Sequence, residues 1–474
     1  MRNLDDKVTF GVIIGTRGFF NPQLASEGRR QVLSLLKRLG YGYVILPEDA
    51  TGHGAVETYA HAKRCAELFD KHRRQIDGIL VILPNFGDEL GLVQTLEMAR
   101  LDVPVLVQAS NDRLDQVGVH QRRDAFCGKI SVCNNLYQYG IPFTDTSQHT
   151  CDIESEQFAQ DLAFFAGVCR VVRGLRHARI GAIGARPAPF QTVRYSEKLL
   201  QDSGITVITV DLSEILARAQ MLDDSAQAVR QKIEQIKAYG QIPPEVLPDQ
   251  ISRQARLSVA IEQWMAENEC VASAIKCWTS VQHNFGCATC LSMSLMGQQH
   301  MPSACEVDVT GAVSMYALLL ASGQAPGFLD WNNNYGDQED KCVCTHCSSL
   351  PREFVGRQIE ISPLDLLGET LGRDRCFGAI KGHVAPGDMT FFRISTDDRL
   401  GRIKAYLGQG QFTDDPFDMD GGIAVCKVDR LRELMGFICQ NGFEHHVAMA
   451  RGRCADILEE AVTKYLDWDL YRHS

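Results

Sequence analysis

Apolar and polar positions follow two different periods along the first third of the chain, and these periods predict strands followed by helices. Runs of β-branched residues indicate strands, and apolar residues at three- and four-residue spacing indicate helices. Strands are expected at residues 8–14, 41–46, 78–83 and 104–108, and helices at residues 24–39 and 56–72. This β-α-β order predicts a parallel sheet with helices packed against it.

The same pattern returns near residue 170 and predicts a second unit of this kind. Strands are expected at residues 179–183, 206–211 and 272–279, and helices at residues 192–203, 225–239 and 250–268. The turn after the first of these strands lacks both GxGxxG and GxxxxGK[ST]. A nucleotide site is therefore unsupported.

Beyond residue 350 the pattern changes to short apolar runs separated by Gly, Asp and Pro, which is typical of antiparallel strands. The runs lie at residues 376–381, 389–394, 403–407 and 422–428, and a final amphipathic helix is expected at residues 454–466. We therefore predict an α/β fold with two doubly wound parallel-sheet domains, residues 1–168 and 169–350, and a C-terminal antiparallel β-rich domain, residues 351–474.

Composition narrows the class of protein further. The 474 residues are 45% hydrophobic and 23% charged, as in an ordinary globular protein, and the net charge is −11. This charge argues against a nucleic acid or an anionic membrane as the main partner. The longest apolar stretch, residues 312–321, is well short of the roughly 20 residues that a spanning helix needs. With no signal-peptide pattern at residues 1–7, we expect a cytoplasmic protein.

The 17 cysteines allow two interpretations. Most are expected to be reduced and buried as small apolar side chains. Alternatively, the Cys287-Ala-Thr-Cys290 pair and the group Cys342, Cys344 and Cys347 could supply thiolates for zinc or an iron–sulfur cluster. The spacings do not repeat as paired CxxC motifs, which favours the first interpretation.

Two carboxylates suggest a site for a divalent cation. Glu306 is expected to open a helix and Asp330 to close the returning strand, 24 residues later, so both could lie at one rim of a sheet. Carboxylates that converge in this way bind hard cations. The alternative is that Glu306 only caps a helix or pairs with its dipole.

Histidines and strand-end residues complete the candidate set. His445 and His446 are adjacent, so on a strand they point to opposite faces and only one would serve a given site. His346 is the other candidate imidazole, and two carboxylates with one or two imidazoles suit Mn²⁺ better than a structural zinc. Arg17 and Asn85 follow predicted strands, where ligands collect in parallel sheets.

These features together resemble the L-fucose isomerase and L-arabinose isomerase superfamily, in particular its shorter fucose-isomerase-like members. The segments that carry the resemblance are Gly15-Thr16-Arg17-Gly18, Cys305-Glu306-Val307-Asp308-Val309-Thr310-Gly311-Ala312, Asp330, Thr345-His346-Cys347 and Glu444-His445-His446. The resemblance implies three domains and a manganese-dependent aldose–ketose isomerase, an intramolecular oxidoreductase. It also implies a homo-oligomer, usually a hexamer, whose active sites are completed by neighbouring subunits.

Site residues follow from the resemblance position by position. Glu306 and Asp330 match the family's metal-binding acid/base carboxylates, and His446 matches its metal-binding histidine, with His445 as the alternative. His346 lies where the arabinose branch has a further metal histidine. Arg17 resembles an N-terminal arginine that contacts the substrate, and it would serve the site of an adjacent subunit.

An open-chain sugar would need further contacts. The indoles of Trp278 and Trp331 suit its apolar face, and Asn332 and Asn333 suit its hydroxyls, although core packing is an alternative for Trp278. The expected reaction removes a proton next to the carbonyl and passes through an enediolate. Which of the two carboxylates is the base is left open.

The substrate and the class of function have alternatives as well. The main expectation is a neutral aldose such as L-fucose or D-arabinose. The alternative is an anionic sugar such as sulfoquinovose, because guanidinium groups of Arg17, Arg186 and Arg194 near strand ends would suit a sulfonate. A rival of another class is a sugar-binding or cysteine-cluster regulatory protein without catalysis.

Overall fold

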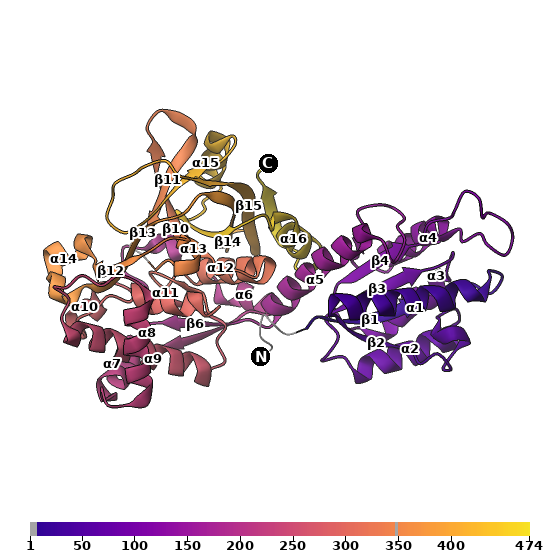
Figure 1. Cartoon of the computed structure of the whole chain (residues 1–474), viewed down its shortest axis with the longest axis horizontal. Coiled ribbons are helices and arrows are strands. Elements are labelled where there is room, and N and C mark those ends of the chain that lie inside the picture. Colours follow the sequence, from indigo (N-terminus) through magenta and orange to yellow (C-terminus); the bar gives the residue numbers. More distant parts are fainter. Residues whose placement is uncertain (1–6, 347–348) are drawn as a thin grey trace. The chain divides into compact units, whose positions relative to one another are not determined.

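The computed structural model describes residues 7–346 and 349–474, and the chain divides into two compact units (Figure 1). The N-terminal unit holds the residues up to Arg173 together with Glu460–Asp467, and the main unit holds Gly174–Glu459 and Trp468–Ser474. Among the described residues, no helix combines the length and the apolar character needed to cross a membrane. The domain boundaries at residues 168 and 350 stay predictions.

The N-terminal unit contains a five-stranded parallel sheet in the order β2-β1-β3-β4-β5, as its strand–helix alternation predicts. Asn21 caps α1 by accepting a hydrogen bond from the Gln23 backbone nitrogen, and Pro22 opens that helix. The strands are β1 (Thr9–Ile14), β2 (Gly42–Ile45), β3 (Gly78–Leu83), β4 (Val105–Ala109) and β5 (Thr144–Asp145). The helices are α1 (Pro22–Leu39), α2 (Tyr59–Lys71), α3 (Glu89–Ala99), α4 (Ala125–Gln138) and α5 (Glu156–Arg176), whose last residues belong to the main unit.

A second parallel sheet, of four strands in the order β7-β6-β8-β9, begins the main unit. The strand expected to reach residue 279 ends at Ile275, because the chain then turns into the short helix α10. The strands are β6 (Arg179–Ile183), β7 (Thr206–Val210), β8 (Ala272–Ile275) and β9 (Ser303–Ala304). The helices are α6 (Glu197–Asp202), α7 (Leu212–Met221), α8 (Gln227–Tyr239), α9 (Pro248–Glu267), α10 (Ser280–Asn284), α11 (Cys290–Gln298) and α12 (Val309–Ser322).

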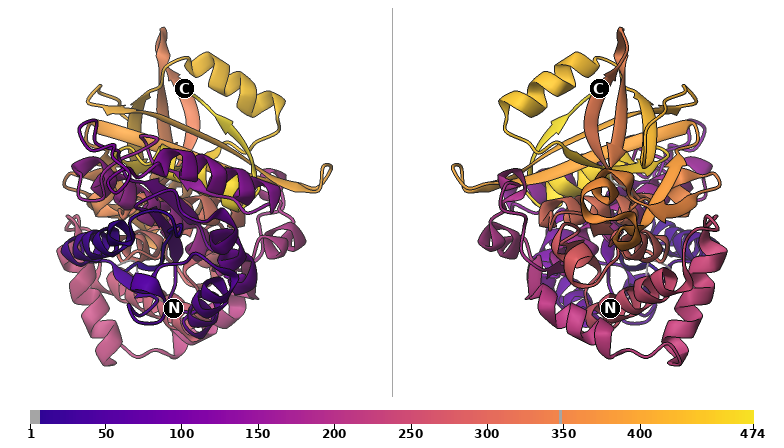
Figure 2. Two further views of the ribbon diagram at one scale, coloured as in Figure 1. Left: turned by 90° about the vertical axis from the view of Figure 1, so that its right-hand side faces the viewer. Right: turned by 90° about the vertical axis from the view of Figure 1, so that its left-hand side faces the viewer.

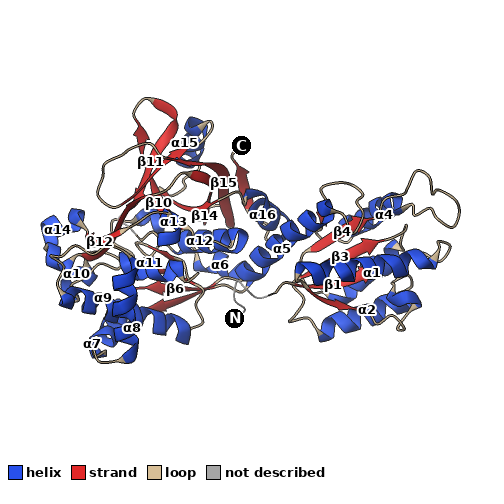
Figure 3. Ribbon diagram, viewed as in Figure 1, coloured by secondary structure: helices blue, strands red, loops and turns tan. Residues whose placement is uncertain are grey.

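The third sheet has nine strands, mostly antiparallel, in the order β12-β13-β16-β11-β10-β17-β14-β15-β18 (Figure 2, orange to yellow; Figure 3, red). Only the pairs β13–β16 and β15–β18 are parallel. The strands are β10 (Gly327–Tyr335), β11 (Gln338–His346), β12 (Glu360–Pro363), β13 (Phe377–His383), β14 (Gly387–Asp397), β15 (Arg402–Thr413), β16 (Gly422–Lys427), β17 (His446–Arg451) and β18 (Asp469–Arg472). Short helices accompany them: α13 (Arg352–Val355), α14 (Asp365–Leu371), α15 (Leu431–Gln440) and α16 (Ala455–Glu460).

The placement of β10 corrects one expectation. Asp330 does not close its strand, which continues to Tyr335, and β10 pairs with β11 and β17 in the nine-stranded sheet instead of lying in the parallel sheet of β9. The apolar run at residues 327–329 gives no sign of this, because pairing to β17 joins residues more than a hundred positions apart.

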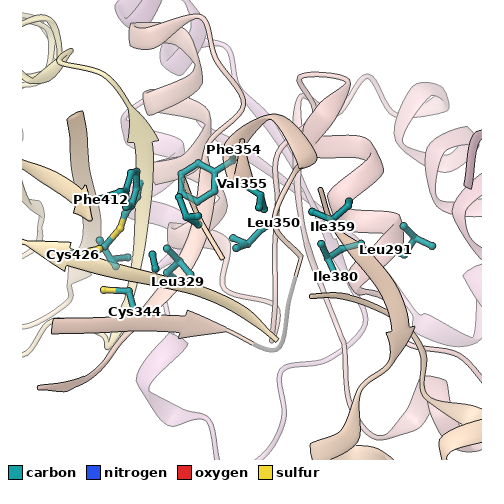
Figure 4. Close-up of a cluster of buried hydrophobic side chains, with 14 of the residues drawn as sticks. Leu291, Leu329, Cys344, Leu350, Phe354, Val355, Ile359, Ile380, Phe412 and Cys426 are labelled. Atoms are coloured by element: carbon teal, nitrogen blue, oxygen red, sulfur yellow. The ribbon is translucent and has the colours of Figure 1, made fainter. Parts of the chain in front are cut away.

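The core beside the nine-stranded sheet shows how the cysteines are used. Cys344 and Cys426 lie among apolar side chains such as Phe354 and Phe412 (Figure 4). The described cysteines are free thiols, and most of them are buried, as predicted. Cys347 lies outside the described residues.

Candidate active site

The connection from β9 to α12 projects Glu306 into the main unit. Glu306 and Val307 adopt left-handed backbone conformations, with φ of 55° and 59°, which non-glycine residues rarely adopt, least of all β-branched ones. Asp308 then caps α12 by accepting a hydrogen bond from the Gly311 nitrogen at 2.8 Å. Such strained residues are concentrated at functional sites, where the surrounding structure holds them.

Four predicted site residues from four separate elements come together here. Glu306 Oε2 lies 3.5 Å from His346 Nε2 and 3.6 Å from His446 Nε2. Asp330 Oδ1 lies 3.5 Å from His446 Nε2 and 3.1 Å from His346 Nδ1. Strand register explains part of this convergence, since Asp330 on β10 is directly opposite His446 on β17.

Hydrogen bonds fix which nitrogen of each imidazole faces the cluster. His446 Nδ1 lies 2.7 Å from Asp308 Oδ2, and His346 Nδ1 lies 3.1 Å from Asp330 Oδ1. Because an ionised carboxylate can only accept, each Nδ1 carries a proton, which leaves Nε2 as the nitrogen of each ring that can bind a cation. The Nε2 atoms are therefore set up as ligands.

The donor set fits a divalent cation. Glu306 Oε2 is buried and has no hydrogen-bond partner among the described residues, and the Nε2 atoms of two imidazoles lie 3.5 and 3.6 Å from it. A cation bound between these three atoms would compensate the buried carboxylate charge. Glu306, His346 and His446 form one possible ligand group, and carboxylate with imidazole suits manganese and similar ions.

The two adjacent histidines differ in burial. His446 is buried and takes part in the cluster, whereas His445 is exposed. His445 nevertheless belongs to a second possible ligand group with Asp330 and His446. Burial and then the charge of His446 lower the pKa of His445.

A buried charge network holds the His446–Asp308 pair. The fully buried Arg393 guanidinium donates to Asp308 at 2.7 and 3.0 Å and to Glu444 at 3.2 Å, and Ser395 Oγ donates to Glu444 at 2.9 Å. Burial opposes the ionised forms of Asp308 and Arg393. Their mutual attraction outweighs burial, so the pKa of Asp308 lies well below its ordinary value and that of Arg393 well above.

Sequence reasoning missed Arg393 and Glu444, and it did not single out Asp308. A signal existed for Arg393, because it is the one charged residue inside the apolar run at 389–394. Asp308 stands two residues after Glu306, but its contacts to Arg393 and His446 span 85 and 138 residues, which spacing along the chain cannot show.

Two aromatic residues border the cluster. Trp278 Nε1 donates a hydrogen bond to Glu306 Oε1 at 3.0 Å, so Trp278 contacts the site instead of only packing in the core. The ring of Phe190, which sequence reasoning also missed, lies edge-on to Trp278 and His445, with centroids 5.5 and 5.8 Å away. Together they form an apolar border to the polar cluster.

Other sequence candidates lie away from these contacts. Asn332 is exposed at a bulge in β10 and makes no hydrogen bond to the cluster within the described residues, and Asn333 is exposed as well. Trp331 Nε1 donates to Tyr406 Oη at 3.0 Å.

Arg17 and Asn85 belong to the N-terminal unit, at the ends of β1 and β3. Asn85 is buried, and its Nδ2 donates to Thr16 Oγ1 at 3.0 Å. Arg17 is ion-paired with Glu89, and its guanidinium lies 4.2 Å from the ring centroid of Phe86. Their roles in substrate binding stay predictions.

The described cysteines do not assemble the cluster that the sequence allowed. Within residues 7–346 and 349–474, Cys287 and Cys290 form no ligand group with Cys342 or Cys344. The Sγ atoms of Cys342 and Cys344 lie 3.9 Å apart inside the hydrophobic core.

Similarity to known proteins covers both the N-terminal and the C-terminal part of the chain. Residues 11–176 match the family described as fucose/sulfoquinovose isomerase, N-terminal domain, and residues 344–473 match L-fucose isomerase, C-terminal domain. The chain is 29% identical over 370 residues to a sulfoquinovose isomerase of Alkalicoccus urumqiensis, covering 76% of this chain and 78% of that protein. It is 25% identical over 395 residues to a sulfoquinovose isomerase of Priestia aryabhattai, covering 81% and 83%.

A solved structure, a glucose-galactose binding protein from Geobacillus stearothermophilus, is 13% identical and covers 68% of this chain and 93% of its own. Its TM-score of 0.16 is too low to support any conclusion.

Proposed function

We propose a specific reaction for this chain, which belongs to the fucose/sulfoquinovose isomerase family and is therefore an aldose–ketose isomerase. The proposed reaction is the interconversion of an anionic aldose of the sulfoquinovose type with its ketose. The observation that carries this proposal is the convergence of the buried Glu306, His346 and His446 with the partly exposed Asp330. A protein that only binds sugar has no need for such a set of cation ligands, which argues against the non-catalytic rival.

The chain's own residues divide the work. Glu306, Asp330 and His446, with His346, would hold a divalent cation, proposed to be Mn²⁺. When bound, this cation supplies positive charge beside the carbonyl and hydroxyl oxygens of the open-chain sugar. Asp308 and Arg393 keep His446 Nδ1 protonated and its Nε2 directed inward.

Proton movement falls to the two carboxylates. Isomerisation removes a proton from C2 of the aldose and returns it to C1, while a second proton moves between O1 and O2. The Asp330 side chain is 22% exposed, against 4% for Glu306, so Asp330 lies on the side from which a sugar can approach. The Trp278 indole holds one Glu306 oxygen and leaves the other for the cluster.

The relatives support the choice of substrate. Those named above are called sulfoquinovose isomerases, which favours an anionic sugar over neutral L-fucose or D-arabinose. We also propose a homo-oligomer whose sites are completed by neighbouring subunits, with a hexamer as the expected size. Light scattering coupled to gel filtration would measure it.

Replacement of Glu306 tests the reaction and the site together. Glu306→Gln keeps the shape of the side chain but removes the charge that faces the two imidazoles, so we expect isomerisation to fall by about 10²-fold or more and Mn²⁺ binding to weaken. Ketose formation from sulfoquinovose and from L-fucose, and Mn²⁺ binding by electron paramagnetic resonance, are the measurements. Far-ultraviolet circular dichroism verifies the fold.

Glu339→Gln, an exposed change on β11 of the same unit, is the matched control and should behave as the wild type. Full activity of Glu306→Gln would refute the assignment of the site. Faster wild-type turnover of L-fucose than of sulfoquinovose would refute the assignment of the substrate.

A further inference from the structure

A large cavity of about 1360 Å³ opens in the main unit beside the ligand cluster. Three parts of the chain supply most of its lining: the segment that follows β6, the turn between β14 and β15, and the connection from α15 to β17. All three belong to the same compact unit as Glu306 and His446.

The buried lining places this cavity next to the cluster. Two buried residues line it: Val307, which is 5% exposed, and Glu444, which is 3% exposed. Val307 directly follows Glu306 in the chain, and Glu444 directly precedes His445. Gln191 also lines it and follows Phe190, whose ring contacts Trp278 and the adjacent histidines. The cavity thus lies one residue along the chain from Glu306, from Phe190 and from His445.

Positive charge is left over in the cavity once its ion pairs are counted. Lys404 pairs with Asp397 at 3.3 Å, and Arg402 pairs with Asp469. The buried carboxylate of Glu444 pairs with Arg393, whose guanidinium it shares with Asp308.

Three lining cations remain. Arg186, Arg194 and Arg399 have no carboxylate within ion-pair distance in the described part of the chain, and only Asp398 among the lining carboxylates is likewise without a partner. An excess of cations in a cavity attracts anionic ligands.

Arg186 and Arg194 contact backbone carbonyl groups and still have N–H donors available for a ligand. Arg186 Nη1 donates to the carbonyl oxygens of Pro187 and Ala188 at 2.9 and 3.1 Å, and Arg194 Nε donates to the carbonyl oxygen of Gln191 at 3.1 Å. Each guanidinium has five N–H groups, so each keeps several donors for a ligand while its backbone contacts fix it to one segment. Arg186 is partly buried, whereas Arg194 and Arg399 are exposed, and Arg399 lies on a turn without such a backbone contact from its guanidinium in the described residues.

We propose that Arg186 and Arg194 bind the anionic group of the sugar substrate while its C1 and C2 face the cluster. This inference rests on the proposed function, which supplies the sugar, and adds the residues that select its charged end. A sulfonate offers three acceptor oxygens, and a guanidinium donates two parallel hydrogen bonds to such a group. The sulfonate of sulfoquinovose is attached to C6, the end of the chain opposite the carbonyl, so its binding residues must lie outside the ligand cluster.

The test compares a charged sugar with its neutral counterpart. Arg186→Gln and Arg194→Gln are each assayed, as Mn²⁺-loaded enzyme, with sulfoquinovose and with 6-deoxy-D-glucose, which lacks the sulfonate. We expect kcat/KM for sulfoquinovose to fall about tenfold or more through KM, the range of one charge-assisted hydrogen bond, while the value for 6-deoxy-D-glucose stays within about twofold. Arg230→Gln, an exposed arginine on α8, is the control and should change neither value.

An equal loss with both sugars would show a structural role and overturn the proposal, as would an unchanged kcat/KM for sulfoquinovose in both variants. A binding measurement separates this inference from the proposed function. Isothermal titration of the wild-type protein and of Arg194→Gln with methanesulfonate needs no turnover. Binding that is lost in the variant supports the anion site even if sulfoquinovose is not isomerised, and no binding to the wild type overturns the inference even if a neutral sugar is.

Discussion

Two carboxylates contact different nitrogen atoms of the His446 imidazole. Asp308 accepts the hydrogen bond of Nδ1, and Glu306 Oε2 lies 3.6 Å from Nε2. A hydrogen-bonded partner behind a ligand histidine fixes the tautomer and the ring orientation. Asp308 is thus a positioning residue for the cluster, and Arg393 in turn fixes Asp308.

Asp308→Asn tests this positioning role. The amide can donate as well as accept, so the ring of His446 loses its fixed orientation, and we expect Mn²⁺ affinity to fall about 10- to 100-fold. Arg393 also loses a buried counter-charge, which should lower the free energy of unfolding by about 3–5 kcal/mol.

Electron paramagnetic resonance of bound Mn²⁺ and urea denaturation measure the two effects of Asp308→Asn. Asp337→Asn, in the exposed turn between β10 and β11, is the control. Unchanged Mn²⁺ affinity in a folded Asp308→Asn protein would contradict the positioning role.

The residues of the cluster could be predicted from the sequence, but the residues that hold the cluster in place could not. Glu306, Asp330, His346 and His446 carry chemically distinctive side chains in recognisable segments, so residue types and their segments were enough to single them out. Arg393 and Glu444 act only through contacts across the fold, and their partners depend on strand pairing.

At the scale of elements, the parallel sheets could be predicted and the nine-stranded sheet could not be predicted in detail. Strand and helix periods within each β-α-β stretch are local, so β1 and β6 lie where the pattern places them. By contrast, β11 pairs with β16 some 80 residues later, and that register depends on the packing of the whole sheet. The antiparallel character was evident from the turns, whereas the inclusion of β10 and β11 was not.

Two helical glycines make a matched pair for testing helix packing. A Cβ at Gly128, in the first turn of α4, would overlap the carbonyl oxygen of Phe86, whereas a Cβ at Gly436 in α15 would meet nothing within 4 Å. Gly128→Ala should therefore lower the free energy of unfolding by about 1–3 kcal/mol. Gly436→Ala should leave it unchanged or raise it by up to about 1 kcal/mol. The urea midpoints of the two variants measure this difference in stability. Equal midpoints would contradict the close approach of α4 to Phe86.

At the scale of the whole molecule, the buried thiols predict a loss of stability in alkali. Burial raises the pKa of Cys65 in the N-terminal unit and of Cys287 in the main unit to about 12. In the unfolded chain these thiols titrate near about 8.5, so above that pH the unfolded state holds fewer protons than the folded state. The stabilising effect is complete below pH 8.5 and is lost as the pH rises toward 12.

The loss amounts to about 1.4 kcal/mol per thiol for each pH unit above 8.5, as an upper value. Urea midpoints at pH 7.5, 8.5 and 9.5 under reducing conditions should fall with pH, and Cys65→Ala should fall less steeply than the wild type. Cys127→Ala, at an exposed thiol of the same unit, should keep the wild-type slope. A slope identical in all three proteins would show that the buried thiols are not the cause.

The separation of the two imidazoles also bears on how the protein is made. His346 ends β11, and His446 begins β17 one hundred residues later. Ribosomes add about 5–20 residues each second, so the second histidine is synthesised roughly 5–20 s after the first. For most of that interval the β10–β11 hairpin lacks both flanking strands, since β16 begins at Gly422 and β17 only at His446, and its edges are open to wrong pairing. A complete ligand set therefore waits until His446 is synthesised, and a chain that stalls in this interval carries an incomplete one.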